Sequence, residues 1–185
     1  MRSHWDTNLN VKQLVLEKKP KLIVECGAGS GENTQQYLDL GLPFKMIVIS
    51  DGELPPRFEG KTGKDFQWIF GISYLELDKF DNESIDFCSI DTDHDYYTLK
   101  MELRALKKKL TPGGVIVIHD TESYRHNSGH MDHYNCGVIY PVKIIEYEVL
   151  GKMYGDAIAE AVEAGKYRVI AESLESNGAM ALVRV

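Results

Sequence analysis

The chain has 185 residues, 43% of them hydrophobic and 26% charged, a composition that suits one domain with a core of its own. Its net charge of −7 disfavours broad electrostatic capture of nucleic acid or of an anionic membrane. Cys26, Cys88 and Cys136 are odd in number and far apart, so they do not indicate a disulfide framework. The sequence has no apolar signal core and no run of 18 apolar residues. We therefore expect a cytoplasmic protein without a membrane partner, folded as a single domain over residues 1–185.

Apolar runs and helical stripes alternate along the first part of the chain. A helical N-terminal segment, residues 1–19, is expected to end before Pro20. The pattern then predicts strands over 21–26, 44–50, 65–71 and 84–91, and helices over 32–41, 73–80 and 96–110. The residues between 51 and 65 contain Pro55, Pro56, Gly60 and Gly63. They exclude a regular crossover helix, and we expect a loop or a single turn there.

The second part of the chain continues the alternation. "TPGG" over 111–114 predicts a turn, and "VIVIHD" over 115–120 predicts a fifth strand. Helices are expected near 141–151 and 155–164, and a closing hairpin over 167–185. Strands that alternate with helices favour a parallel sheet covered on both faces. We thus predict an α/β fold: a Rossmann-like, doubly wound, mostly parallel seven-stranded sheet with a C-terminal antiparallel hairpin.

The stretch "IVECGAGSGEN" places a glycine-rich turn between a predicted strand and a predicted helix. Gly27 can turn tightly, Gly29 can let a ligand approach the backbone, and Gly31 lies where free N–H groups face an anion. The spacing is not G-x-G-x-x-G, because position 32 is a glutamate. A plain strand-to-helix turn is the structural alternative. The carboxylate of Glu25 suits a ligand that carries an ammonium group.

Glu-x-Gly-x-Gly-x-Gly at the end of the first strand resembles the first motif of class I S-adenosylmethionine-dependent methyltransferases. The resemblance covers nearly the whole chain, because the strand order and the closing hairpin fit as well. It implies S-adenosylmethionine as cofactor, with Glu25 near the ammonium group. It also implies that the loop wraps the methionine part through Gly27, Ala28, Gly29 and Gly31.

The same resemblance assigns the remaining cofactor contacts. Asn33, at the start of the helix, is expected to meet the methionine carboxylate. Asp51, directly after "MIVIS", is expected to bind the ribose hydroxyls, with Glu53 as the fallback. Ser73 in "GIS" is expected to contact the adenine, and Asp91 is assigned to the cofactor side as well.

Acidic and imidazole side chains follow two predicted strands. "SIDTDHDYY" contains Asp91 and His94, and "VIHDTE" contains His119 and Asp120. Neighbouring strand ends can bring Asp91, His119 and Asp120 together around one hard cation. The alternative is that these residues are helix N-caps and solvated loop acids, and Asp95 is expected to be such a cap.

The pattern "IDxDHxYxxxxxxL…LxPGGxxxxHD" resembles the metal-dependent small-molecule O-methyltransferases of the catechol, caffeoyl-coenzyme-A and antibiotic-pathway types. That resemblance implies a divalent metal, magnesium or manganese, held by Asp91, His119 and Asp120. His119 departs from the carboxylate common in the family and favours manganese over magnesium. His94 takes the position of the family's base, so His94 and Asp91 are the expected catalytic residues.

The segment "RHNSGHMDHYNC" allows two interpretations. His126, His130, His133 and Cys136 have a spacing that can bind zinc or iron. The Gly, Asn and Ser content favours instead an active-site lid over 121–140.

The sequence thus predicts metal-assisted O-methylation of a small acceptor with a hydroxyl group, by a chain that is a possible homodimer. A non-catalytic S-adenosylmethionine-binding module is the first alternative. A metal-free methyltransferase acting on a sugar, peptide or nucleic acid is the second alternative. The negative net charge of the chain disfavours nucleic acid.

Overall fold

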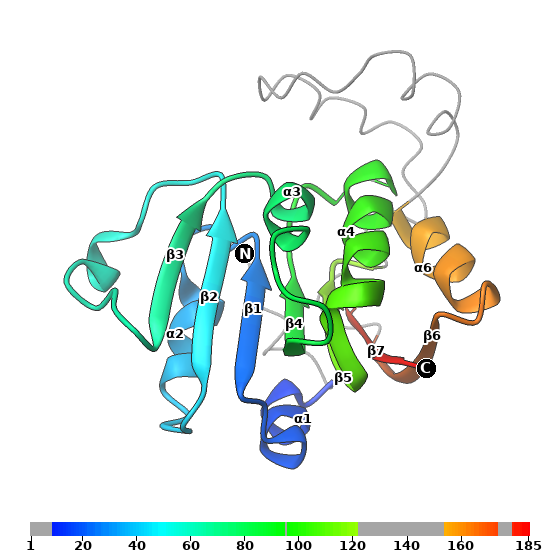
Figure 1. The fold of residues 1–185 in the computed structure, drawn as a ribbon, viewed down its shortest axis with the longest axis horizontal. Coiled ribbons are helices and arrows are strands. Elements are labelled where there is room, and N and C mark those ends of the chain that lie inside the picture. The colour runs from blue at the N-terminus through cyan, green and yellow to red at the C-terminus, as the bar shows by residue number, and fades with distance from the viewer. Residues whose placement is uncertain (1–8, 95, 122–153, 174–178) are drawn as a thin grey trace.

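The computed structural model describes residues 9–94, 96–121, 154–173 and 179–185 (Figure 1). The described helices are α1 (Val11–Lys18), α2 (Glu32–Leu38), the 3₁₀ turn η2 (Pro56–Phe58), α3 (Ser73–Leu77), α4 (Tyr96–Lys109) and α6 (Tyr154–Glu163). The strands are β1 (Leu22–Cys26), β2 (Lys45–Ser50), β3 (Phe66–Phe70), β4 (Ile85–Ile90), β5 (Leu110–His119), β6 (Tyr167–Ser173) and β7 (Ala179–Arg184). None of the helices in these ranges is long and apolar enough to cross a membrane.

The seven strands form one sheet in the order β3-β2-β1-β4-β5-β7-β6. Strands β1 to β5 pair in parallel, whereas β7 is antiparallel to both β5 and β6. The predicted fold class is therefore confirmed. The chain leaves β1 toward β2 and β3, then returns to the other side of β1 to form β4 and β5. This reversal opens a crevice at the carboxyl ends of the strands, where open α/β sheets bind ligands.

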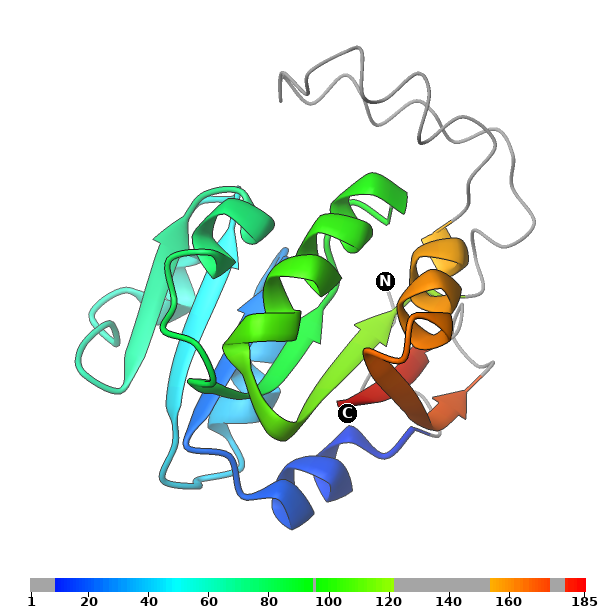
Figure 2. The same cartoon turned by 45° about the vertical axis from the view of Figure 1, so that its right-hand side comes forward.

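Helices cover both faces of the sheet, because alternate strand residues point to opposite sides (Figure 2). Ile23 packs with Val15 and Tyr37 in a core under α1 and α2. Its neighbour Val24 packs with Leu99 of α4 and other residues from α3 and α6 in the second core. Both cores belong to the same sheet, so a shift in the position of either helix layer would move the strand ends that form the crevice.

One predicted element boundary is wrong. The turn expected at 111–114 is part of β5, which begins at Leu110 directly after α4. The chain bends inside the strand instead: Gly113 has a φ of 69°, and the register with β4 shifts between Ile85 and Phe87. Proline and glycine therefore mark an irregularity within this strand and not its start.

The predicted loop between β2 and β3 is confirmed, with η2 as its single turn. Its residue Phe58 is fully buried and replaces a crossover helix on that face of the sheet. The ring centroid of Phe58 lies 5.4 Å from that of Phe66 and 6.2 Å from that of Trp68. A Cβ atom at Gly31 would overlap the Phe58 ring, so the loop also presses against the start of α2.

A buried carboxylate joins β1 to α2. Glu25 has no exposed surface, and Thr34 donates a hydrogen bond of 2.6 Å from Oγ1 to its Oε2 atom. The buried Oε1 atom has no hydrogen-bond partner in the described structure. Burial raises the pKa of Glu25 from 4.5 to about 8; the Thr34 hydrogen bond opposes this shift and the charge of Asp91 adds to it. Glu25 therefore holds a proton at neutral pH in the free protein.

We expect Phe58→Ala to lower the free energy of unfolding by about 3–5 kcal/mol, because it leaves a cavity between the loop, Phe66 and Trp68. Urea unfolding followed by circular dichroism measures the change. Phe70→Ala is the matched control, since Phe70 is 71% exposed and should change stability by no more than about 0.5 kcal/mol. Equal losses in the two variants would contradict the packing role of Phe58.

We expect Glu25→Gln to change how stability depends on pH. The unfolded chain releases the Glu25 proton above pH 4.5, whereas the folded chain keeps it to about pH 8. This group therefore destabilises the fold as pH rises through that window, by up to about 1.4 kcal/mol per pH unit. Urea unfolding at pH 5 and pH 7.5 should show a smaller loss for the variant than for the wild type. Equal losses would contradict the raised pKa, and Glu163→Gln, at an exposed site on α6, controls for charge removal.

Candidate functional site

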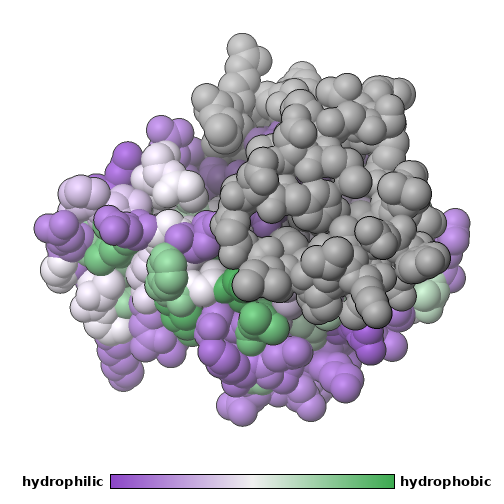
Figure 3. Space-filling view, turned by 90° about the horizontal axis from the view of Figure 1, so that it is seen from above, coloured by the Kyte–Doolittle hydropathy of each residue, from purple (hydrophilic) through white to green (hydrophobic). Residues whose placement is uncertain are grey.

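A pocket of about 230 Å³ lies at the carboxyl ends of β1 to β4. Figure 3 looks down on this edge of the molecule, where hydrophobic and hydrophilic side chains of the described residues adjoin. The pocket brings together five residues that the sequence assigned to the cofactor: Gly27, Gly29, Asp51, Ser73 and Asp91. Glu53, the fallback for the ribose, does not line it. The pocket thus spans the loops that follow β1, β2, β3 and β4.

The three loop glycines meet different constraints. Gly27 has a φ of 78°, and a Cβ atom there would overlap the backbone of Asp91. Gly31 has a φ of 79° and adjoins the Phe58 ring. Gly29 has a φ of 49° with no atom within 4 Å of its Cβ position. Of the three loop glycines, Gly29 alone combines a left-handed backbone with open space at its Cβ position, and it lines the pocket.

Other predicted cofactor residues lie outside the pocket wall. Glu25 is buried at the base of the glycine loop, and Ala28 is 7% exposed. Asn33, expected at a ligand carboxylate, is also buried, and its Nδ2 atom donates a hydrogen bond of 3.4 Å to Oδ2 of Asp91. Asn33 therefore connects α2 to the acidic cluster, and its contact with a cofactor stays a prediction.

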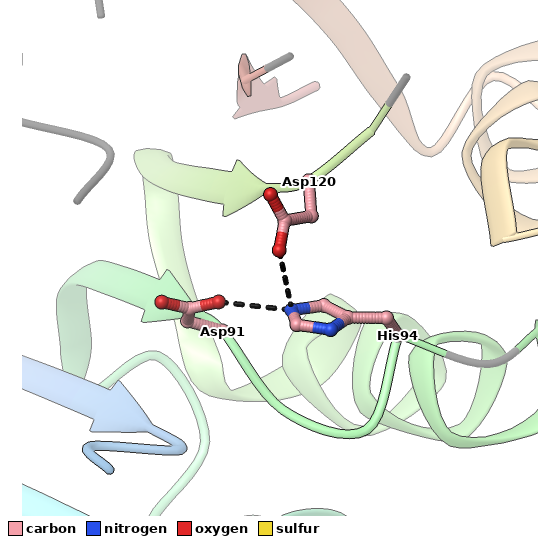
Figure 4. A group of neighbouring side chains, drawn as sticks. All are labelled: Asp91, His94 and Asp120. Atoms are coloured by element: carbon pink, nitrogen blue, oxygen red, sulfur yellow. Dashed lines mark hydrogen bonds and ion pairs between the residues drawn. The ribbon is translucent and has the colours of Figure 1, made fainter. Parts of the chain in front are cut away.

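His94 lies between the carboxylates of Asp91 and Asp120 (Figure 4). Its Nε2 atom is 2.9 Å from Oδ1 of Asp91 and 3.3 Å from Oδ2 of Asp120. His119 approaches the same two groups, with Nδ1 at 3.2 Å from Asp91 and 3.5 Å from Asp120. Two strand ends thus bring two carboxylates and two imidazoles together, as their positions after β4 and β5 predict.

The two imidazoles keep Asp91 ionised. Burial would raise its pKa, but hydrogen bonds from His119 and His94, with their positive charge when protonated, hold the pKa of Asp91 well below its ordinary value. Asp91 therefore stays a carboxylate throughout the physiological pH range. It can accept hydrogen bonds or bind a cation, but it cannot donate a proton to a substrate.

Two of the three predicted metal ligands, Asp91 and Asp120, belong to a group of side chains that could hold a metal ion. Ligand atoms of Asp91, His94 and Asp120 all lie within 4.8 Å of one another. His119, the expected third ligand, is 2% exposed and contacts both carboxylates, but it is not part of this group. The group contains instead His94, which the sequence assigned as the base.

The backbone at this cluster is unusual. His94 has a φ of 55° and Asp120 a φ of 57°, left-handed conformations that are uncommon for residues other than glycine and that asparagine, aspartate and histidine adopt more often than the rest. Such conformations cost about 1 kcal/mol or more each and persist where the surrounding structure holds them. They turn both side chains toward Asp91 from different strand ends.

Sequence reasoning missed Thr34, Thr92 and Glu102. Thr34 holds Glu25, and Glu102 accepts hydrogen bonds from Ser73 and from Thr92. Glu102 could have been found from the sequence, because it is an acidic residue on the buried, leucine-rich side of α4. Nothing in the sequence marks Thr34 or Thr92.

Some predictions lie outside the described residues. They concern Asp95, the helix near 141–151, the ligand set His126, His130, His133 and Cys136, and all of the lid beyond Thr121.

Solved structures with the same fold are known. A Staphylococcus aureus protein assigned as a caffeoyl-CoA O-methyltransferase is 14% identical, with a TM-score of 0.67 over 95% of this chain and 81% of that chain. A Burkholderia thailandensis 1,6-didemethyltoxoflavin-N1-methyltransferase, with S-adenosylhomocysteine bound, is 12% identical, with a TM-score of 0.58 over 97% of this chain and 80% of that chain. A Methanosarcina mazei SAM-dependent methyltransferase is 13% identical, with a TM-score of 0.59 over 95% and 97%. At these identities the likeness establishes the fold.

No curated protein matches the sequence at a significant level. The family model described as "Methyltransferase domain" matches residues 24–121, which is more than half of the 185-residue chain. The matched region contains the glycine loop, the pocket wall and the Asp91, His94 and Asp120 group. The chain therefore belongs to the methyltransferase domain family.

Proposed function

We propose that this chain transfers a methyl group from S-adenosylmethionine to a hydroxyl group of a small acceptor. One observation carries the proposal: the glycine loop and the acidic cluster touch, because Gly27 packs against the backbone of Asp91. A donor held by the loop would thus lie directly beside groups that can bind and deprotonate an acceptor. Membership in the methyltransferase domain family supports the donor, and the caffeoyl-CoA O-methyltransferase-like neighbour supports oxygen as acceptor atom.

The pocket suits an extended cofactor that lies across the strand ends. Its amino acid part would lie over the β1 loop, where Gly29 leaves space. Asp51 after β2 would accept hydrogen bonds from the ribose hydroxyls, and Ser73 after β3 would meet the base. Charge-assisted hydrogen bonds of this kind contribute about 1.5–3 kcal/mol each.

His94 is the group placed to take the acceptor proton. Carboxylate oxygens of Asp91 and Asp120 lie at 2.9 and 3.3 Å from its Nε2 atom and hold the imidazole in place. General base catalysis from such a position contributes about 10²–10⁴-fold. The methyl group would pass from sulfur to oxygen in line as the proton moves to nitrogen.

As an alternative to base catalysis by His94, the same side chains fit a divalent metal, since an imidazole nitrogen that binds an ion cannot take a proton. Asp91, His94 and Asp120 would hold it, because their ligand atoms lie within 4.8 Å of one another. The buried Oδ1 atom of Asp120 has no hydrogen bond among the described residues, and Nδ1 of His119 lies 3.5 Å from it. Two carboxylates and one imidazole suit manganese or iron better than magnesium. Such an ion would supply Lewis acidity at the acceptor hydroxyl.

We expect Gly29→Val to weaken binding of S-adenosylhomocysteine by more than about tenfold, a loss of at least about 1.4 kcal/mol, because a branched side chain in this wall of the pocket strains the left-handed backbone and hinders the approach of a ligand to it. Calorimetric titration measures the affinity. Gly60→Val is the matched control: Gly60 also has a positive φ, 73°, and no atom within 4 Å of its Cβ position, but it lies in the loop after η2. Unchanged affinity in Gly29→Val would contradict the cofactor assignment.

We expect removal of metal ions by EDTA to show whether the Asp91, His94 and Asp120 group needs a divalent ion for methyl transfer. Methylation of 3,4-dihydroxybenzoate with labelled S-adenosylmethionine should stop in EDTA and return with Mn²⁺. Asp120→Asn should lower Mn²⁺ affinity by at least about tenfold, whereas Asp81→Asn, at an exposed position, should not.

The His94→Gln variant decides whether the imidazole is a ligand or a base. Lost Mn²⁺ affinity would make it a ligand, and retained affinity with slowed transfer would make it the base. Full transfer in EDTA would leave a metal-free methyltransferase. Binding of S-adenosylhomocysteine without transfer to sugar, peptide, nucleic acid or phenolic acceptors would leave a binding module.

A further inference from the structure

The indole of Trp68 is hydrogen-bonded to the loop that follows β2. Its Nε1 atom donates a hydrogen bond of 3.3 Å to the carbonyl oxygen of Gly52. Trp68 is a partly buried residue of β3 and does not line the pocket, whereas Gly52 is part of the pocket wall. The bond therefore connects a side chain outside the pocket to the backbone of its wall.

The orientation of the indole is fixed by the aromatic side chains beside it. The ring centroid of Trp68 lies 6.2 Å from that of Phe58, and the two ring planes are 29° apart. Phe58 has no exposed surface, and its ring also lies against Phe66 and against the backbone of Gly31. Because the Trp68 ring is already held by this packing, its N–H group bonds to Gly52 with little further loss of side-chain entropy.

The bonded stretch is a short turn with Asp51 at its centre. Ser50 is held in β2, where its carbonyl accepts a hydrogen bond of 3.0 Å from the N–H of Gly71. The N–H of Gly52 donates a hydrogen bond of 3.2 Å to Oγ of Ser50, and the carbonyl of Gly52 accepts the bond from Trp68. Both neighbours of Asp51 are thus restrained, one by its own strand and the other by the indole.

The position of the Asp51 carboxylate depends on this backbone. Asp51 is exposed, and its side chain has no hydrogen bond or ion pair in the described part of the chain. Glycine has access to more backbone conformations than other residues, so an unrestrained Gly52 would let Asp51 take several positions. A binding group that is held in place before the ligand arrives avoids the cost of ordering, and affinity rises accordingly.

We propose that Trp68 is a positioning residue that holds Asp51 ready for a ligand with two neighbouring hydroxyl groups. The inference rests on the proposed function, which supplies the ribose. The indole acts on the hydroxyl-bearing part of the ligand alone, because its hydrogen bond reaches only the loop after β2. Loss of the N–H group therefore weakens ligands that carry both hydroxyls and spares ligands that lack them.

The test compares S-adenosylhomocysteine with its 2′,3′-dideoxy counterpart by calorimetric titration. The wild type should bind the first ligand at least about tenfold more tightly, because the dideoxy ligand cannot donate hydrogen bonds to Asp51. Trp68→Phe keeps an aromatic ring beside Phe58 and removes the N–H group. It should weaken S-adenosylhomocysteine by about fivefold, the usual effect of one lost hydrogen bond, and change the affinity of the dideoxy ligand by less than about twofold.

Two further variants separate positioning from packing. In the Asp51→Ala variant, the additional substitution Trp68→Phe should have no further effect on either ligand, because the indole acts through Asp51. Phe66→Leu disturbs the same aromatic cluster but removes no hydrogen bond to the loop after β2. It should therefore keep the wild-type ratio of the two affinities.

A measurement on the unchanged Trp68 serves where Trp68→Phe fails to fold. The chain has two tryptophans, so the indole N–H signal of Trp68 can be assigned by NMR with the variant Trp5→Phe. A bound ligand that holds Asp51 also holds the carbonyl of Gly52 in place. Saturation with S-adenosylhomocysteine should therefore slow hydrogen exchange of the Trp68 indole more than saturation with the dideoxy ligand does.

The outcomes separate this inference from the proposed function. Equal weakening of both ligands by Trp68→Phe, or equal slowing of indole exchange by both, would show a merely structural role and overturn the inference. Unchanged affinities in Trp68→Phe, or a wild type that binds both ligands equally, would overturn it too while leaving the proposed methyl donor intact. Binding of neither ligand to the wild type would overturn the proposed function and this inference with it.

Discussion

The close approach of the β1 and β4 loops is the constraint on which the rest of the site depends. Gly27 donates its backbone N–H to the carbonyl of Ile49, and Asp91 donates its own to the carbonyl of Cys26, each over 2.9 Å. The first bond extends the pairing of β1 with β2 by one residue. The second extends the pairing of β1 with β4 and brings the β1 and β4 loops into contact. No side chain fits at Gly27, because the Asp91 backbone fills the space. Gly27 of the β1 loop and Asp91, the first acid of the cluster after β4, are thus parts of one packed contact.

The site holds two carboxylates whose pKa values move in opposite directions. Glu25 and Asp91 are both removed from water, which raises the pKa of any acid. Glu25 has a single hydroxyl donor and titrates at about pH 8, whereas two imidazoles keep the pKa of Asp91 far below its ordinary value. The site therefore has a neutral acid at the base of the glycine loop and a charged one in the cluster that follows β4. A cationic ligand near the loop would favour ionised Glu25, so binding and proton release would be coupled at that end.

The sequence predicted the features that follow from hydrophobic periodicity and from the position of a residue relative to the strands. Apolar runs gave the strands, and the residues that follow β1 to β4 converge on one pocket because parallel strands end at one edge. The irregular start of β5 was missed, since Pro112 and Gly113 have the same composition in a turn and in a bent strand. That His94 and not His119 belongs to the group with Asp91 and Asp120 follows from the placement of the side chains, which no motif encodes. Thr34, Thr92 and Glu102 act through partners distant in sequence, and such pairs follow from tertiary packing alone.

The position of β3 at the sheet edge has a consequence for local stability. This strand pairs with β2 alone, and on one face it is covered by the Phe58 loop, which contains a single short turn. Strands of this kind open in native-state hydrogen exchange before the centre of the sheet does. The part of the pocket proposed to meet the base would then be the part that opens most readily. Ligand binding would slow amide exchange in β3 and α3 more than in β4, which is already held between two neighbours.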